Sequence, residues 1–362
     1  MPIVEIIIAI LLLSILVVVH ELGHFLMAKK LGIKVEEFGI GLPPRLWGIK
    51  RGETIYSINK LPLGGFVKLA GEDEAEVSSS EIEDRSKQEL RRYFFARSKK
   101  ERAVVLLAGV AMNFLVAVLL ISFIFTQGAF VPTDRVHIER VIENSPAAAA
   151  GLQPKDVIVE FAHQPIKTSE ELIRLTKEHA SQSTPVKIDR VGKQIEIMIT
   201  PRQTTSRNEG PLGIVISNVE ERKYSLLEAP YYGLKYALEV SVQVYITLGM
   251  ILWRLITFQS LGGVDVGGPI RIVEETAKAV NLGILPALNI MALISLNLAL
   301  INVLPIPALD GGRLLFVVFE KIIGRRVKPK IEQTAHQIFF ILLIGLILLI
   351  TTNDILRKIR GL

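Results

Sequence analysis

The sequence predicts a polytopic α-helical membrane protein that also carries a membrane-associated β-hairpin region and a soluble α+β domain. Half of its 362 residues are hydrophobic and the mean hydropathy is +0.41, which is too apolar for an ordinary soluble enzyme. The apolar residues gather in runs close to the roughly 20 residues that a bilayer-spanning helix needs. Charged residues make up 22% of the chain, which is enough for substantial soluble parts.

Four apolar segments are predicted to span the membrane, and two prolines interrupt the third. We expect a first transmembrane helix in residues 1–34, a membrane-associated β region in 35–71, a cytosolic linker in 72–102, a second transmembrane helix in 103–126, an extracytoplasmic soluble domain in 136–217, interfacial amphipathic helices in 224–283, the broken third transmembrane helix in 284–323 and a fourth transmembrane helix in 333–353.

The basic residues lie beside the apolar segments. Lys29, Lys30 and Lys34 follow the first helix, and four more basic residues between positions 97 and 102 precede the second. The positive-inside rule places both flanks in the cytosol, and the N-terminus and the chain after Thr126 outside. We therefore expect a multi-pass inner (plasma) membrane protein in contact with lipid. The net charge of +6 needs no nucleic-acid partner.

The first apolar run, from Ile3 to Val19, leads without proline or glycine into the pattern His-Glu-Leu-Gly-His. It resembles a signal peptide, but no charged region precedes it and no small-x-small cleavage site follows, so we expect it to be retained. The absence of cysteine excludes disulfides and thiolate metal sites.

The histidines of this pattern are candidate ligands of a zinc ion. His20 and His24 are four residues apart, so both lie on one face of a helix and both imidazoles can reach one metal. Glu21 then lies beside the metal, as in the H-E-x-x-H signature, where the glutamate is the general base. The alternative is an interfacial helix end whose polar groups reach the headgroups, although lysine and arginine usually serve that purpose.

Residues 35–70 read as short strands separated by turns. Four glycines mark these turns and are candidate substrate-binding positions, namely Gly39, Gly41, Gly64 and Gly65. The apolar side chains between them are numerous for a soluble hairpin, so the region is expected to dip into the membrane beside the metal. An ordinary cytosolic sheet is the alternative.

The soluble domain resembles a PDZ domain. Residues 141–159 follow the PDZ order of a strand, a short alanine-rich helix and a Gly-Leu turn into the next strand. No Gly-Leu-Gly-apolar loop precedes Val136, but Pro211-Leu212-Gly213-Ile214 follows instead, which predicts a circularly permuted PDZ domain. Leu212, Gly213 and Ile214 are then candidate contacts for a peptide added to the last strand. The alternative is a plug that only screens the membrane site.

The segment from Lys235 to Phe258 is long enough to span. Its polar residues recur at helical spacing and form one stripe, so we expect it to lie in the outer interface. A fifth span at this point would also carry the following segment away from the depth of His20 and His24.

Two histidines leave a zinc ion short of a protein ligand. Asp310 follows the break at Pro305 and Pro307 and is the candidate third ligand, and Asn302 on the other side of the break is a candidate donor to an oxyanion. The alternatives are a helix N-cap for Asp310 and interhelical hydrogen bonding for Asn302 and Asn297.

Together these motifs resemble the site-2 protease family of intramembrane zinc metalloproteases, and within it the bacterial RseP-like group. The matching motifs are His20-Glu-Leu-Gly-His24, Gly39-x-Gly41, Ala108-Gly109-x-x-x-Asn113-Phe114, the PDZ-like unit, Gly268-Pro269 and Asn302-x-x-Pro-x-Pro-x-Leu-Asp310-Gly-Gly. The resemblance implies a single-pass membrane protein as substrate, such as an anti-sigma factor already trimmed outside, or a remnant signal peptide. Val110 stands where the family usually has proline, and one PDZ unit is present rather than two.

Two other classes of function remain as alternatives. A catalytically inactive membrane chaperone or sensor would bind peptides through the PDZ domain, but such relatives usually lack the glutamate or a metal ligand. A zinc transporter would need an aqueous route and usually several ligand clusters, and one cluster is visible.

Overall fold

The computed structural model describes residues 3–72, 86–203, 210–257, 259 and 267–360. Its residues form two compact units, which we call the helical unit (residues 1–124 and 227–362) and the sheet unit (residues 125–226).

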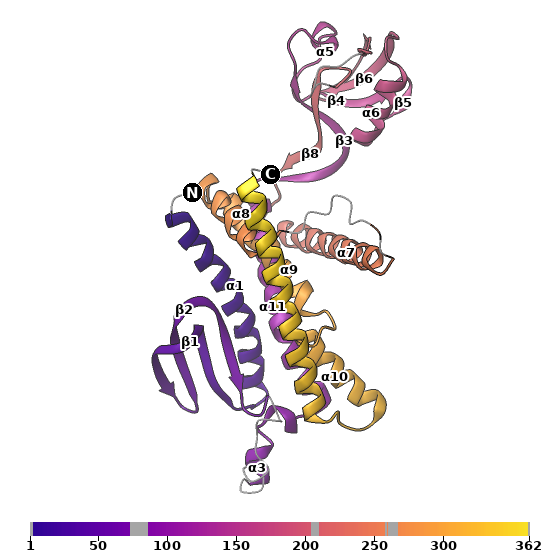
Figure 1. Ribbon diagram of the computed structural model, residues 1–362. Helices are drawn as coiled ribbons and strands as arrows, with labels where there is room; N and C mark the ends of the chain where they lie inside the picture. The colour runs from indigo at the N-terminus through magenta and orange to yellow at the C-terminus, as the bar shows by residue number, and fades with distance from the viewer. Residues whose placement is uncertain (1–2, 73–85, 204–209, 258, 260–266, 361–362) are drawn as a thin grey trace. The chain divides into compact units, whose positions relative to one another are not determined.

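The helical unit consists of helices and one long, folded β-hairpin (Figure 1). Its elements are α1 (Ile3–Lys30), β1 (Val35–Arg51), β2 (Thr54–Leu69), α3 (Lys87–Leu90), the 3-10 helix η2 (Phe94–Ala96), α4 (Lys99–Gln127), α7 (Ala229–Ile256), α8 (Pro269–Leu282), α9 (Ile284–Asn302), α10 (Asp310–Ile323) and α11 (Pro329–Arg360).

Among the described residues, five helices are long and apolar enough to cross a membrane. Four of them, α1, α4, α9 and α11, overlap the predicted spans, and α4 and α11 extend beyond theirs at both ends. Helix α7 is the fifth, and it covers the segment that the sequence assigned to the interface.

Strands β1 and β2 each fold back, so that the hairpin forms four paired segments. Residues 35–40 pair on one side with 65–69 and on the other with 55–58, whereas 45–51 pair with 54–59. Residues 65–69 are therefore an edge of this sheet. Residues 55–58 lie inside it, so that segment offers no free edge.

Helix α1 packs on α4 through glycine. A Cβ atom at Gly23 would lie 2.4 Å from the carbonyl oxygen of Ala108, so only glycine permits this approach. Buried apolar side chains extend the contact toward the hairpin and α10, namely Ala28, Ile33, Val35, Leu69, Phe94, Val105, Leu106 and Val317.

A tight loop separates α9 from α10 at the two prolines. Its compactness depends on the glycines that follow, because a Cβ atom at Gly311 would lie 2.2 Å from Leu304 O and one at Gly312 would lie 2.2 Å from Ile306 O. Asp310 is the first residue of α10, and the N-cap is Leu309, so the N-cap interpretation of Asp310 is wrong.

The far end of α10 is fixed by a buried ion pair. Arg102 of α4 pairs with Glu320, and both side chains are less than a tenth exposed. Lys99 Nζ also donates to Glu320 O at 2.7 Å. These contacts hold α10 against the first turns of α4 and thereby limit where Asp310 can lie.

The sheet unit contains β3 (Ala129–Val141), α5 (Pro146–Ala149), β4 (Val157–Phe161), β5 (Gln164–Pro165), α6 (Ser169–Glu178), β6 (Thr184–Arg190), β7 (Lys193–Ile199) and β8 (Ile214–Arg222). The strand order is β7-β6-β4-β3-β8, with β5 beside β4. The last strand thus pairs with the first. A capping box of Thr168 and Glu171 begins α6, and the backbone N–H groups of Lys167 and Thr168 lower the pKa of Glu171.

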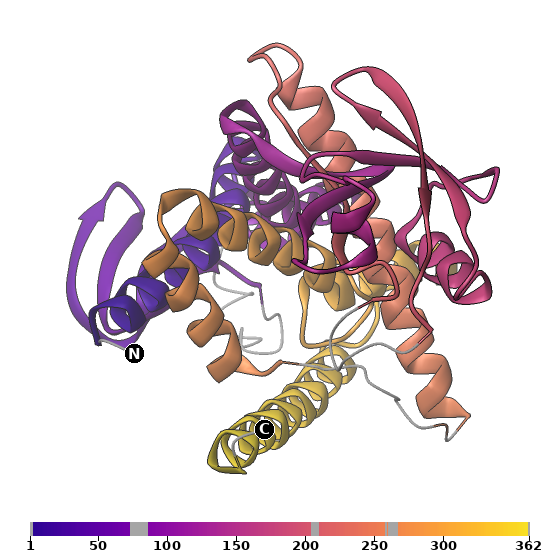
Figure 2. The ribbon, with the colours of Figure 1, turned by 90° about the horizontal axis from the view of Figure 1, so that it is seen from above.

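Helix α7 runs crosswise to α1, α9 and α11 in Figure 1, and Figure 2 shows it along its length. Tyr245 Oη donates to Leu300 O at 3.2 Å, and a Cβ atom at Gly233 would lie 2.3 Å from Ser122 Oγ, which places α7 against α9 and α4.

The crosswise direction predicts that both ends of α7 lie on the same side of the membrane. Single cysteines at Leu227 and Gln259, in this cysteine-free chain, should react equally with an impermeant thiol reagent in intact cells. A site that reacts only after permeabilisation, while the other reacts before it, would make α7 a fifth span.

Candidate metal centre and catalytic cavity

The two histidines of α1 face the same point. His20 Nε2 and His24 Nε2 lie 3.1 Å apart, and both residues are buried. This arrangement follows from their i, i+4 spacing on an unbroken helix.

Asp310 completes the cluster from a segment 290 residues away. Its Oδ2 atom lies 2.9 Å from His20 Nε2 and 3.2 Å from His24 Nε2. Two imidazole nitrogens and a carboxylate oxygen thus meet in a triangle with sides of about 3 Å. Ligand atoms of a tetrahedral site with bonds of about 2.0–2.2 Å are separated by roughly 3.3–3.6 Å, so the triangle fits a single small ion after slight expansion.

The outer ring nitrogens also have partners. His24 Nδ1 donates to Val105 O at 2.8 Å, which leaves Nε2 without a proton and free to bind a metal. His20 Nδ1 lies 3.5 Å from the side-chain amide of Asn113. Asn113 is fully buried and its Oδ1 atom has no partner among the described residues, so a rotated amide would accept the His20 Nδ1 proton.

Helix α4 passes directly beside the histidines at Gly109. A Cβ atom there would lie 2.3 Å from His24 Nε2 and 2.8 Å from His20 Cε1. The glycine therefore makes room for the two rings at the crossing of α1 and α4.

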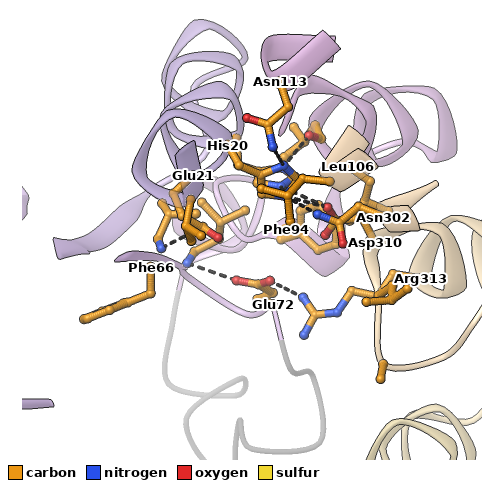
Figure 3. A pocket seen from close by; sticks show the side chains of 18 of the residues that line it. His20, Glu21, Phe66, Glu72, Phe94, Leu106, Asn113, Asn302, Asp310 and Arg313 are labelled. Atoms are coloured by element: carbon orange, nitrogen blue, oxygen red, sulfur yellow. Dashed lines mark hydrogen bonds and ion pairs between the residues drawn. The ribbon is translucent and has the colours of Figure 1, made fainter. Parts of the chain in front are cut away.

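The carboxylate of Glu21 is held by the hairpin. Val67 lies in the edge segment 65–69 and donates its backbone N–H to Glu21 Oε2 at 3.1 Å. Glu21 lines the same cavity as the three-residue cluster (Figure 3), and it is not part of the cluster. A carboxylate in this position can take a proton from a water molecule in the cavity.

Asn302, the last residue of α9, lies on the other side of the cluster. Its Nδ2 atom is 3.4 Å from His20 Nε2, and its side chain lines the cavity together with Leu298 and Leu309. Its amide can donate to an oxygen atom bound beside the cluster.

The cavity has a volume of about 440 Å³ and one polar end. There Glu72, just after β2, accepts from Leu69 N at 3.3 Å and pairs with Arg313, one turn beyond Asp310 (Figure 3). The pair joins the edge segment to α10 across the cavity. His336 of α11 also lines it.

A family model described as Peptidase family M50 matches residues 8–346, nearly the whole chain. The chain belongs to peptidase family M50. Zinc metalloprotease RasP of Shouchella clausii is 32% identical over 415 aligned residues, 94% of this chain and 96% of the relative. Zinc metalloprotease RasP of Oceanobacillus iheyensis is 29% identical over 421, covering 96% and 98%.

Two solved structures resemble part of the chain. They are PDZ domains of SdrC-like proteins from Listeria monocytogenes and Listeria innocua, with 22% and 25% identity. They cover 24% and 25% of this chain and 90% and 98% of their own, each with a TM-score of 0.21.

As a member of family M50, the protein is a zinc metalloprotease of the site-2 protease family, and its several apolar helices make it a membrane protein. The donor set fits zinc, because two imidazoles with hydrogen-bonded outer nitrogens and one carboxylate leave a fourth position open. In the described part of the chain, no other cluster of three such side chains is present.

The candidate substrate-binding residues from the sequence lie in different parts of the structure. Gly64 and Gly65 lie against Val17 and Val18 of α1, whereas Gly39 lies between Phe66 and Asn59 inside the hairpin. Gly41 packs against Leu61 O. Leu212, Gly213 and Ile214 are in the sheet unit, where a Cβ atom at Gly213 would lie 2.3 Å from Ser145 Cβ.

No prediction from the sequence covered three groups that line the cavity of the His20-His24-Asp310 cluster. Val67 contributes only its backbone N–H, so no side-chain signal marks it. Glu72 stands at the start of an acidic stretch that resembles a linker, and Arg313 resembles a basic flank of a helix. The Asp-Gly-Gly-Arg spacing was the one available signal, since residues i and i+3 share a helical face.

Gly109→Ala is predicted to displace the histidine rings and to abolish stoichiometric zinc binding, because the new methyl group would occupy the position of His24 Nε2. Gly345→Ala in α11 is the matched control, since a Cβ atom there meets nothing within 4 Å. Zinc content of the purified variants would be measured by mass spectrometry. Equal zinc in both would show that the crossing of α1 and α4 does not set the site.

Proposed function

We propose that the protein hydrolyses a peptide bond within or near the transmembrane segment of single-pass membrane proteins. The observation that carries this proposal is the position of Glu21, whose carboxylate lines the cavity of the His20-His24-Asp310 cluster and is fixed by Val67 N–H. Metal ligands, a separate base and an amide donor thus surround one cavity among membrane-type helices.

His20, His24 and Asp310 would hold the zinc ion. When bound, zinc supplies Lewis acidity, which polarises the scissile carbonyl and makes water more acidic. Val105 and Asn113 orient the two imidazoles through their outer nitrogens.

Glu21 acts as the general base. It takes a proton from the attacking water as the water oxygen bonds to the carbonyl carbon, and it delivers that proton to the leaving amide nitrogen as the C–N bond breaks. Asn302 Nδ2 donates to the carbonyl oxygen as negative charge develops there. The products are a carboxylic acid and an amine, which exchange a proton to become a carboxylate and an ammonium group.

The proposed substrates are an anti-sigma factor already trimmed outside the membrane, or the remnant of a signal peptide. The proposed location is the inner (plasma) membrane, with the sheet unit outside and the catalytic cavity near the cytosolic side, in agreement with the lysines at the end of α1.

We also propose that the sheet unit is a circularly permuted PDZ domain. Its last strand, β8, is an edge strand beside β3, and Asn218 of β8 accepts from the backbone N–H of Ser169 in α6 at 2.8 Å. An edge strand next to a helix suits a peptide added as a further strand. Screening of the membrane site is the alternative role.

An unwound substrate segment would add to the edge segment 65–69. The outward N–H groups of this edge are those of Val67 and Leu69, and Glu21 and Glu72 accept from them. A substrate strand that pairs at Val67 therefore takes this N–H from Glu21, which leaves the Glu21 carboxylate to accept from the attacking water, and the strand recovers hydrogen bonds that lipid cannot supply. Because the affinity comes from main-chain hydrogen bonds, the stability of the substrate helix matters more for cleavage than the identity of its side chains.

The second candidate function is a catalytically inactive chaperone or sensor that binds peptides through the sheet unit. It accounts for β8 but gives no reason for a base and three metal ligands around one cavity.

Glu21→Gln is predicted to keep about one zinc per chain and to lose cleavage of a model transmembrane substrate by at least about 10²–10⁴-fold, because the amide can still accept from Val67 but cannot take a proton. Glu5→Gln, on the same helix and outside the cavity, is the matched control and should cleave normally. Loss of zinc in Glu21→Gln would make Glu21 a ligand, and retained cleavage would refute its role.

Val67→Pro removes the edge N–H and is predicted to slow cleavage more than about tenfold with zinc retained, whereas Val67→Ala keeps the N–H and should change the rate less than about threefold. Replacing helix-destabilising substrate residues with leucine should slow the unmodified enzyme as well. If none of these changes alters the rate, strand addition is the wrong mode of binding.

A further inference from the structure

A second cavity lies beside the catalytic one in the helical unit. Its volume is about 510 Å³, within the range of roughly 300–1,000 Å³ that ligand pockets have. Its walls come from α1, the hairpin, α8 and α9. The lining residues are Ile10, Leu13, Ser14, Val17, Leu42, Leu63, Gly64, Gly65, Pro269, Ile272, Val273, Ile294 and Leu298.

This cavity offers nothing to a polar ligand. Ser14 contributes the one polar side chain of its lining, and the hydroxyl is already used, since it lies 2.8 Å from both Ile10 O and Pro62 O and accepts from Gly64 N at 3.2 Å. The occupant must therefore be apolar where it meets these walls.

The apolar cavity and the catalytic cavity are adjacent. Val17 of α1 and Leu298 of α9 line both of them. Beyond the metal cluster, the catalytic cavity ends at Glu72 and Arg313. From the apolar cavity to the far end of the catalytic cavity, the lining residues thus change from apolar side chains, through the cluster, to a charged pair.

The walls of the apolar cavity are fixed in place. Gly64 and Gly65 bring the hairpin against α1, where Cβ atoms would lie 3.1 Å from Val17 and 3.0 Å from Val18. Asp354 of α11 accepts from the backbone N–H of Gly268, the N-cap of α8, at 3.0 Å, which holds the first turn of α8 in position.

We propose that the apolar cavity binds apolar side chains of the substrate's transmembrane segment, on the side of the scissile bond that lies deeper in the membrane. The inference rests on the proposed function. Its basis is the match in polarity, because a transmembrane segment cut near its end is apolar on one side of the cut and polar on the other, as the path is. The edge segment begins at Gly65, in the wall of this cavity, and runs past the cluster, so one bound strand can reach both.

Binding of substrate side chains in the apolar cavity determines which substrates the site can select. Main-chain pairing at Val67 does not depend on the side chains of the substrate. The apolar cavity therefore selects substrates by the size of the side chain that it binds. Leu13 and Ile294, from α1 and α9, line this cavity, so the size of their side chains sets part of the room inside it.

Cysteine crosslinking tests where the substrate lies, since the chain has no cysteine of its own. Leu13→Cys in a Glu21→Gln background should form a disulfide with a single cysteine on the deeper side of the cut in a model transmembrane substrate. Leu11→Cys, on the same helix but 48% exposed and outside the cavity, is the matched control and should not. Ala308→Cys in the catalytic cavity should crosslink near the scissile bond.

These outcomes separate the two proposals. Crosslinking from Ala308→Cys without crosslinking from Leu13→Cys, or with equal crosslinking from Leu11→Cys, overturns the substrate pocket and leaves the protease intact. Failure of all three, with no cleavage by the unmodified protein, overturns the proposed function and the pocket with it.

Changing the size of the pocket supplies an independent readout. Tryptophan at the crosslinked substrate position should slow cleavage about tenfold relative to leucine, and Leu13→Ala should restore the rate where Leu11→Ala does not. Discrimination between tryptophan and leucine that is unchanged in Leu13→Ala would refute the proposal.

Discussion

The structure depends on the meeting of two imidazoles and a carboxylate from opposite ends of the sequence. His20 and His24 belong to α1, and Asp310 begins α10, yet their ligand atoms lie about 3 Å apart. Polar groups at this depth are costly to desolvate unless they are paired or bind a metal. Most other features of the helical unit serve to bring these three groups together and to hold them there.

Glycine makes the approach possible at each crossing. Gly23 and Gly109 let α1 and α4 meet at the histidines, and Gly311 and Gly312 let the loop after α9 fold tightly beneath Asp310. Polar tethers then fix the rotation of α10, with Glu72 holding Arg313 near the site and Arg102 holding Glu320 at the far end. The pair of Glu72 and Arg313 lies at the polar end of the cavity, and the hairpin edge supplies the backbone N–H that holds the Glu21 carboxylate.

The parts of this arrangement that sequence could predict are those with a local signal. Helical spacing put His20, Glu21 and His24 together, and the proline pair marked the break before Asp310. The proline break and the need for a third ligand pointed to Asp310, but its distances to the histidines, 290 residues away from His20, come only from the structure.

Backbone contributions were beyond sequence reasoning. The hydrogen bond from Val67 to Glu21, and the position of residues 55–58 inside the hairpin, depend on how β1 and β2 each fold back. The composition of α7 is compatible both with a membrane span and with a helix in the interface. The crosswise direction of α7 results from its packing against α4 and α9. Gly109 was visible as a motif, but only the distances to His24 explain why glycine is needed there.

The central claim is that Asp310, and not a third histidine, completes the zinc site. His336 lines the same cavity and is the alternative. Zinc K-edge absorption of the full-length protein with one equivalent of zinc tests this directly, because imidazole gives characteristic outer-shell scattering. The account predicts nitrogen and oxygen ligands at about 2.0–2.2 Å with the scattering of two imidazoles, unchanged in His336→Gln. The scattering of three imidazoles, falling to two in His336→Gln, would contradict it.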